Sequence, residues 1–464
     1  MIKPWHIIAV WTALFFFYGQ QAFITSSEFW PVFASKNILS FSPSWASLFM
    51  KPLFNLLLSM VHYLPLTDVQ HLKGVKTIFA FNGAAQILLI YFIFKAYQPT
   101  KPWLAVALTV LITLSPFYLK TYFQIRSDQL ALTLFLVFLL LNFTTFQFKS
   151  AWNILFLFAF PLIGFKHIYF SFLALLVLKI KETFSFLKTS LRFERYYIYV
   201  LFGGLLIWTA NLAIPSFTYF SRTVVDFENN FGALKLFFKF EFLLILLSLG
   251  AFCYLPLRAE FMRRGYAKLF LLPVAIVFLL LLHPQKFDFF IGSFVPILFL
   301  LAGFLLFSCL QQNPKKIIWG LALIFAFEAL SVYKASQQIK LITSYKTQLA
   351  TIHSITKIFA GRPLTYIDGM GILPRQRNLG CFISPDDYES NQSCLDLVNQ
   401  HKPDVVILTT RLASYLTDLS LLTKANYVEQ GANFYIKKEL AGQSPADELI
   451  WVPPVLIFGS DDLL

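Results

Sequence analysis

The chain has 464 residues, of which 57% are hydrophobic, 18% aromatic and only 13% charged, with a mean hydropathy of +0.65. Apolar runs long enough to cross a bilayer recur through two thirds of it, which excludes a single soluble core and predicts a polytopic α-helical membrane protein. The excess of positive charge in the net +14 lies in residues 1–333, where 26 Lys/Arg against 11 Asp/Glu give +15, whereas residues 334–464 carry −1. Loop charge that orients a membrane protein accounts for this excess without a nucleic-acid partner.

About eleven transmembrane helices are predicted in this first region. They cover residues 5–25, 75–95, 102–119, 128–147, 152–165, 167–180, 196–215, 238–256, 269–283, 287–307 and 317–333. The first is interpreted as an uncleaved anchor, because no small-residue cleavage site follows it. The run 52–64 is too short to span and is predicted to lie on the membrane surface.

The distribution of Lys and Arg predicts the orientation. One set of short loops carries fifteen of them, whereas the opposite set carries eleven on much longer loops. By the positive-inside rule the first set is cytoplasmic. The chain is therefore predicted to lie in the cytoplasmic (inner) membrane with its N-terminus on the cytoplasmic side. The first loop 26–74 and residues 334–464 are predicted to lie on the outer face.

Residues 334–464 change in composition and are predicted to form a small extracytoplasmic (periplasmic) α/β domain, with an apolar tail at 451–458. Helices are expected at 351–359 and 394–401, and strands at 363–367, 405–408 and 433–436. The turn that starts at Asp368 is not interpreted as a phosphate loop, because Pro374 follows closely. Cys381 and Cys394 could pair in an oxidising compartment, and the sequence leaves this open.

The first candidate for chemistry is Glu28, which directly follows the first apolar run. A carboxylate at the edge of hydrocarbon needs a function or a partner to keep it there. Several cations lie at the same predicted outer face, each next to a further polar group, and such a cluster suits a lipid phosphate. They are Lys120, Arg126 near Asp128, Lys166 beside His167, and Lys286 after His283. Headgroup snorkelling is the simpler interpretation of each cation alone.

Together, a base and a phosphate site indicate glycosyl transfer from a lipid-phosphate sugar. The region 1–333 resembles the GT-C glycosyltransferases, which use polyprenyl-phosphate sugars. The resemblance rests on Glu28 after the first span, on Met50-Lys51-Pro52-Leu53 at the end of the first outer loop, and on three further stretches. These are Ile125-Arg126-Ser127-Asp128, Gly164-Phe165-Lys166-His167 and His283-Pro284-Gln285-Lys286.

The resemblance implies that Glu28 is the catalytic base and that Arg126, Lys166 and Lys286 lie near the donor phosphate. Lys120, Asp128, His167, His283 and Lys51 are supporting candidates. Ser27 stands where many members have a second acid, so no metal or other cofactor is expected, although a divalent metal stays an open alternative. One base without a second carboxylate favours an inverting reaction. The sugar and the glycan, lipid or protein acceptor stay unidentified.

Three alternatives are weighed. A transporter or flippase would bind an anionic lipid-linked substrate with the same cations, but no internal repeat is visible in the predicted spans. A polysaccharide ligase or polymerase would use a diphosphate donor, which the sequence does not distinguish. A non-catalytic scaffold protein would not explain the presence of Glu28 and the cations at the outer face.

Overall fold

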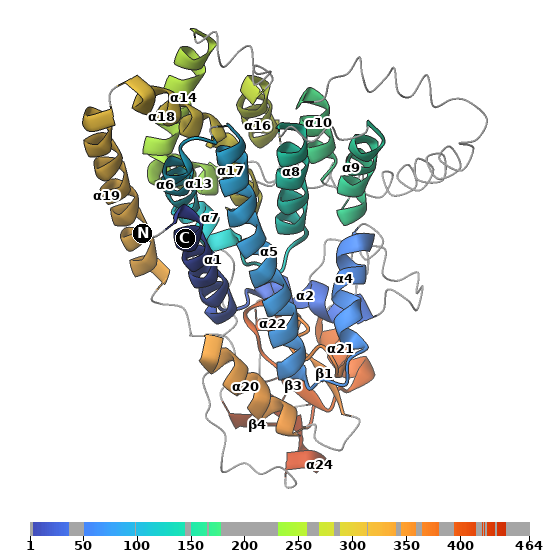
Figure 1. The fold of residues 1–464 in the computed structure, drawn as a ribbon. Coiled ribbons are helices and arrows are strands. Elements are labelled where there is room, and N and C mark those ends of the chain that lie inside the picture. Colours follow the sequence, from blue (N-terminus) through green and yellow to red (C-terminus); the bar gives the residue numbers. More distant parts are fainter. Residues whose placement is uncertain are drawn as a thin grey trace, which may run out of the picture. The chain divides into compact units, whose positions relative to one another are not determined.

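The computed structural model describes most of the chain. The described residues are 3–36, 51–97, 99–143, 150–164, 167–177, 231–257, 269–282, 288–312, 314–339, 345–358, 364–379, 394–413, 420, 422, 425–431 and 434–441. The described part is mostly helical, with one small sheet (Figure 1). It divides into two compact units. Met1–Phe17 and Ala80–Ser336 form one, here called the helical unit, and Tyr18–Phe79 with Gln337–Leu464 form the other, here called the α/β unit.

The helical unit contains almost all of the predicted apolar segments as helices. Its elements are α1 (Pro4–Gln21), the later part of α5 (Asp68–Tyr97), α6 (Pro102–Thr113), α7 (Pro116–Thr121), α8 (Ser127–Phe143), α9 (Ser150–Ile163), α10 (Ile168–Val177), α13 (Phe231–Phe240), α14 (Phe242–Tyr254), η5 (Leu255–Leu257), α16 (Leu271–Leu282), α17 (Asp288–Leu298), α18 (Leu300–Gln312) and α19 (Pro314–Ile339). The predicted segment 196–215 lies outside the described residues.

Eleven full-length spans are nevertheless not found in the part of the chain that the structure describes. Among the described residues, α5 and the segment Phe290–Cys309 are long and apolar enough to cross a membrane, and a pair of helices bent by 82°, α13 with α14, would add a third. The other apolar helices are shorter within the described residues, and in one predicted segment a local break is visible. The predicted segment 102–119 is split at Ser115, whose hydroxyl accepts a hydrogen bond from Tyr118 N and caps α7, with Pro116 at the first helical position.

In the helical unit, two glycines allow helices to pack closely against neighbouring segments. A Cβ added to Gly292 of α17 would lie 2.3 Å from Thr121 Oγ1 of α7, and one added to Gly83 of α5 would lie 2.8 Å from the carbonyl oxygen of Tyr122. Only glycine therefore fits at these two contacts. Many large apolar side chains point outward instead, among them Trp319 and Leu323, which are 79% and 75% exposed. Such a surface is typical of contact with lipid or another protein.

The α/β unit combines the first loop region with the C-terminal region. From the first come α2 (Ser26–Ala34), α4 (Pro52–His62) and the start of α5, and from the second α20 (Tyr345–Ile358), β1 (Thr365–Ile367), β2 (Arg377–Asn378), α21 (Cys394–His401), β3 (Val405–Ile407), α22 (Thr410–Ala413), β4 (Tyr427–Gly431), β5 (Phe434–Lys437) and α24 (Lys438–Ala441). The sequence-based boundaries had placed loop 26–74 in the first domain, so this grouping differs from the expected one.

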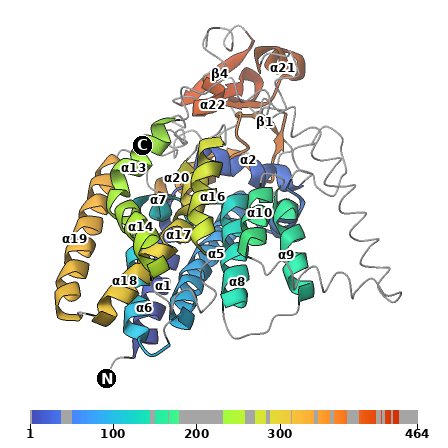
Figure 2. The same cartoon turned by 90° about the horizontal axis from the view of Figure 1, so that it is seen from above.

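The sheet has the order β2-β1-β3-β5-β4. β1 pairs in parallel with β2 and β3, whereas β5 pairs antiparallel with β3 and β4. The apolar core beneath it includes Val406 of β3, Val398 of α21 and Leu412 of α22, and Figure 2 shows α21 and α22 beside the strands. The expected strands at 363–367, 405–408 and 433–436 are confirmed with small shifts, while β2 and β4 were not predicted.

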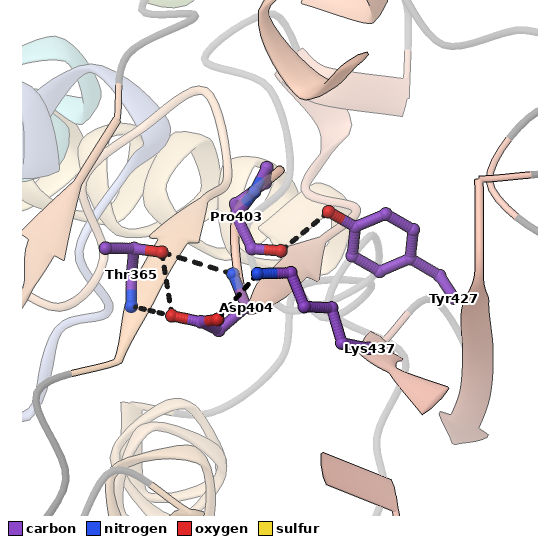
Figure 3. A network of polar contacts seen from close by, with 5 residues as sticks. All are labelled: Thr365, Pro403, Asp404, Tyr427 and Lys437. Carbon is purple, nitrogen blue, oxygen red and sulfur yellow. Dashed lines mark hydrogen bonds and ion pairs between the residues drawn. The ribbon is translucent and has the colours of Figure 1, made fainter. Parts of the chain in front are cut away.

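A short network fixes the neighbouring ends of three strands (Figure 3). Thr365 donates to Asp404 Oδ2 from its backbone N at 2.8 Å and from its hydroxyl at 2.9 Å. Lys437 Nζ lies 2.8 Å from Asp404 Oδ1. Tyr427 OH donates to the carbonyl oxygen of Pro403 at 2.6 Å. The Asp404 carboxylate thus links the start of β1 with the end of β5.

A second contact ties the first loop region to the C-terminal region within the α/β unit. The carboxylate of Asp68, at the start of α5, accepts from Arg375 N at 2.8 Å and from Gln376 Nε2 at 2.9 Å. Arg375 Nη1 donates to the carbonyl oxygen of Leu64, and Lys36 Nζ to that of Gln376, both at 2.9 Å. Asp68, which no sequence pattern singled out, is therefore a buried structural residue.

Candidate functional site

Glu28 lies in the first turn of α2, and its carboxylate accepts a hydrogen bond from the residue that caps this helix. Its Oε2 atom accepts a hydrogen bond from the backbone N–H of Thr25 at 2.7 Å, which is one half of a capping box. The side chain is 0% exposed. Glu28 is therefore enclosed by the protein and is not a solvated carboxylate at a helix end.

Lys76 of α5 supplies the opposite charge. Its Nζ atom lies 3.7 Å from Glu28 Oε1 and donates to the carbonyl oxygen of Phe23 at 3.4 Å. Lys76 is 1% exposed. No motif in the sequence pointed to Lys76, although its position at the start of a predicted span was a signal of burial. The ion pair makes the buried carboxylate of Glu28 tolerable, since an unpaired buried charge costs several kcal/mol, on the order of 3–5.

Helix α20 completes the surroundings of Glu28. The side-chain amide of Gln348 accepts from Ile24 N at 2.9 Å and donates to Ile24 O at 2.8 Å, which fixes the segment before α2. Burial, together with the negative charge of Glu28, raises the pKa of Tyr345. The Tyr345 hydroxyl is buried, and no atom of the described residues forms a hydrogen bond with it. No sequence signal identified Gln348 or Tyr345.

In the turn after β1, the carboxylate of Asp368 accepts hydrogen bonds from the backbone N–H groups of the residues that follow it. Asp368 accepts from the backbone N–H groups of Met370, Gly371 and Ile372 at 3.1, 2.9 and 2.8 Å, and from Asn378 Nδ2 at 2.7 Å. These amides converge as in a phosphate cradle, but Asp368 already occupies them. The expectation that this turn is no phosphate loop rested on Pro374, whereas in the structure Asp368 fills the cradle.

The helical unit contains four of the other candidate residues. Lys120 and Arg126 are half-buried, and Asp128 and His167 are buried. Asp128 lies in the first turn of α8, and its charge acts on Tyr169 of α10. The structure thus brings the polar beginnings of α8 and α10 together.

The start of α17 packs against the same place. The ring of Tyr169 contacts that of Phe290 with centroids 5.3 Å apart, and His167 lies over Phe170 at 6.1 Å. Lys166, His283 and Lys286 lie outside the described residues, so their predicted proximity to Arg126 stays a prediction. Lys51 is half-buried at the N-cap of α4 in the α/β unit, which also contains Glu28.

The described residues bear on metal binding and leave the predicted cysteine pair open. Within the described ranges no group of three His, Cys, Asp or Glu side chains could hold a metal ion. Cys381 lies outside those ranges and the side chain of Cys394 is not described, so their pairing stays untested.

Comparison of the chain with protein-family models, curated proteins and solved structures gives no match.

Proposed function

We propose that this protein is a membrane glycosyltransferase that moves a sugar from a polyprenyl-phosphate donor to an acceptor hydroxyl, with Glu28 as general base. One observation carries the proposal. The buried carboxylate of Glu28 is paired with Lys76, and its charge acts on the buried Tyr345 hydroxyl, which has no hydrogen-bond partner among the described residues. Buried polar groups normally have partners, so a hydroxyl without one favours a place where a ligand supplies the missing contact.

The chemistry follows from these groups. Glu28 takes the proton of the acceptor hydroxyl, the acceptor oxygen attacks the anomeric carbon, and the bond from that carbon to the phosphate oxygen breaks. The electron pair stays on the departing phosphate, whose charge the cations Lys120, Arg126, Lys166 and Lys286 stabilise. The single displacement inverts the anomeric centre. Because Glu28 is enclosed, the reaction requires the residues around it to open for the acceptor.

We further propose that the enzyme resides in the cytoplasmic (inner) membrane, with its N-terminus cytoplasmic and residues 334–464 outside. The excess of Lys and Arg on one set of short loops supports this orientation. The large apolar side chains exposed on α1, α14, α16 and α19 support contact with lipid.

The test is Glu28→Gln in the purified full-length protein, assayed with a panel of polyprenyl-phosphate sugars. Glutamine keeps an acceptor for Thr25 N but is no base, so turnover should fall by about 10²–10⁴-fold with donor binding retained. Arg126→Ala and Lys120→Ala should instead weaken donor binding. Glu439→Gln, at an exposed glutamate of the same unit, is the matched control and should leave turnover unchanged.

Two outcomes would contradict the proposal. If wild type neither hydrolyses nor transfers any donor, the glycosyltransferase function fails. If Glu28→Gln lowers the melting temperature and turnover in proportion, Glu28 is a structural cap of α2 rather than the base. Lys76→Met separates these roles further, because loss of the ion pair should lower stability whichever role Glu28 has.

A further inference from the structure

Two glutamates lie inside the helical unit. Glu241 sits at the bend between α13 and α14, and Glu328 lies on α19; both are 0% exposed. On the described part of α19 the buried side chains are Ile324, Glu328 and Ser331, which form one helical stripe. The Glu328 side chain is therefore directed away from the exposed apolar face of α19 and toward the interior. Ionisable groups in such surroundings are costly and usually functional.

The hydrogen bonds of this pair are incomplete. Glu241 Oε1 accepts from the hydroxyl of Ser115 and, at 3.1 Å, from the backbone N of Phe117, both at the start of α7. The other oxygen of Glu241 and both oxygens of Glu328 find no donor among the described residues. Three buried acceptor atoms thus lack a donor, and each calls for an explanation, since buried acceptors are nearly always satisfied.

The two carboxylates belong to one electrostatic site. Helix α19 lies beside α14 in both views (Figures 1 and 2). The charge of Glu241 acts on Glu328, and no lysine, arginine or histidine of the described residues pairs with either. The groups that face the pair from α7 are the neutral Ser115 hydroxyl and the Phe117 amide. Two like charges in an apolar interior cannot both stay ionised without a cation or a proton between them.

We propose that Glu241 and Glu328 form a proton-binding site, in which one proton held by the pair leaves a single negative charge. A proton from water adds to one carboxylate oxygen, which neutralises that carboxyl and leaves the other as the single negative charge. A metal ion suits the site less well, because Ca²⁺ takes six to eight oxygen ligands and Mg²⁺ an octahedral set. The described residues offer three unused carboxylate oxygens. This site is separate from the proposed role of Glu28 and does not depend on it.

The experiment is infrared spectroscopy of the full-length protein in detergent at pH 7. Wild type should show the absorption of a protonated carboxyl, and this absorption should be weakened or shifted in both Glu328→Gln and Glu241→Gln, because each variant removes one of the two carboxyl groups between which the proton is distributed. Glu439→Gln, at an exposed glutamate, should leave this absorption intact. An absorption that persists unchanged in both variants, or that wild type lacks, would overturn the proposal.

Two further measurements cover a variant that fails to fold and the rival occupant. Ser115→Ala keeps both carboxylates but removes a donor to Glu241, so it should shift the carboxyl absorption, and a spectrum identical to wild type would count against the site. Replacement of choline by Na⁺, K⁺ or Ca²⁺ at constant ionic strength should leave the melting temperature unchanged. A rise that is lost in Glu328→Gln would identify a metal cation as the occupant and overturn the proton site.

Discussion

At the residue scale, Asp404 offers a pH test of the sheet. Burial raises the pKa of Asp404, but the hydrogen bonds from Lys437 and Thr365 outweigh burial and lower the pKa overall. A carboxylate with a lowered pKa contributes stability above its unfolded pKa, and this contribution is lost as pH falls through the folded value. Asp404→Asn should therefore destabilise the protein by about 1–3 kcal/mol at pH 7 and by less below pH ~4.

The measurement is the melting temperature of both proteins between pH 3 and pH 8. A difference that is constant over this range would show that the charge of Asp404 contributes nothing and that the loss comes only from the acceptor oxygen that asparagine lacks. Lys437→Met should reproduce the loss at pH 7, because it removes the charged donor from the same carboxylate.

At the element scale, the packing of α2 against the turn after β1 depends on Gly371. Its φ of +78° is one that side chains rarely adopt, and a Cβ added there would lie 2.6 Å from Cβ of Phe33 in α2. Gly371→Ala should thus cost roughly 1–3 kcal/mol and lower the melting temperature. Gly320→Ala in α19 is the control, since no described atom lies within 4 Å; it should be neutral or stabilise by up to ~1 kcal/mol. Equal melting temperatures for the two variants would contradict this packing.

Sequence patterns predict helices and strands better than they predict which polar side chains are buried. Apolar runs located the helices, and Cys394–His401 was predicted with its exact bounds. Span lengths were overestimated because an apolar run does not reveal a cap such as Ser115 within it. β2 has two residues and exists through its pairing with β1, which no local pattern encodes. The burial of Glu28 depends on Lys76 and on α20, more than 300 residues further along the chain, so the sequence pointed to the residue but not to its surroundings.

At the scale of the whole molecule, the proposed function requires Glu28 and the C-terminal region to face the same side of the membrane. The orientation rests on fifteen cations on short loops against eleven on longer ones. We predict that a cysteine at Glu439, which is exposed on α24, reacts from outside intact cells with a membrane-impermeant maleimide. A cysteine at the exposed Lys3 should react only after the membrane is permeabilised. Both Glu439→Cys and Lys3→Cys are made in a chain whose four native cysteines are replaced. The reverse labelling pattern would place the C-terminal region in the cytoplasm, where Glu28 could act only on cytoplasmic acceptors. The proposed reaction at the outer face would then be excluded.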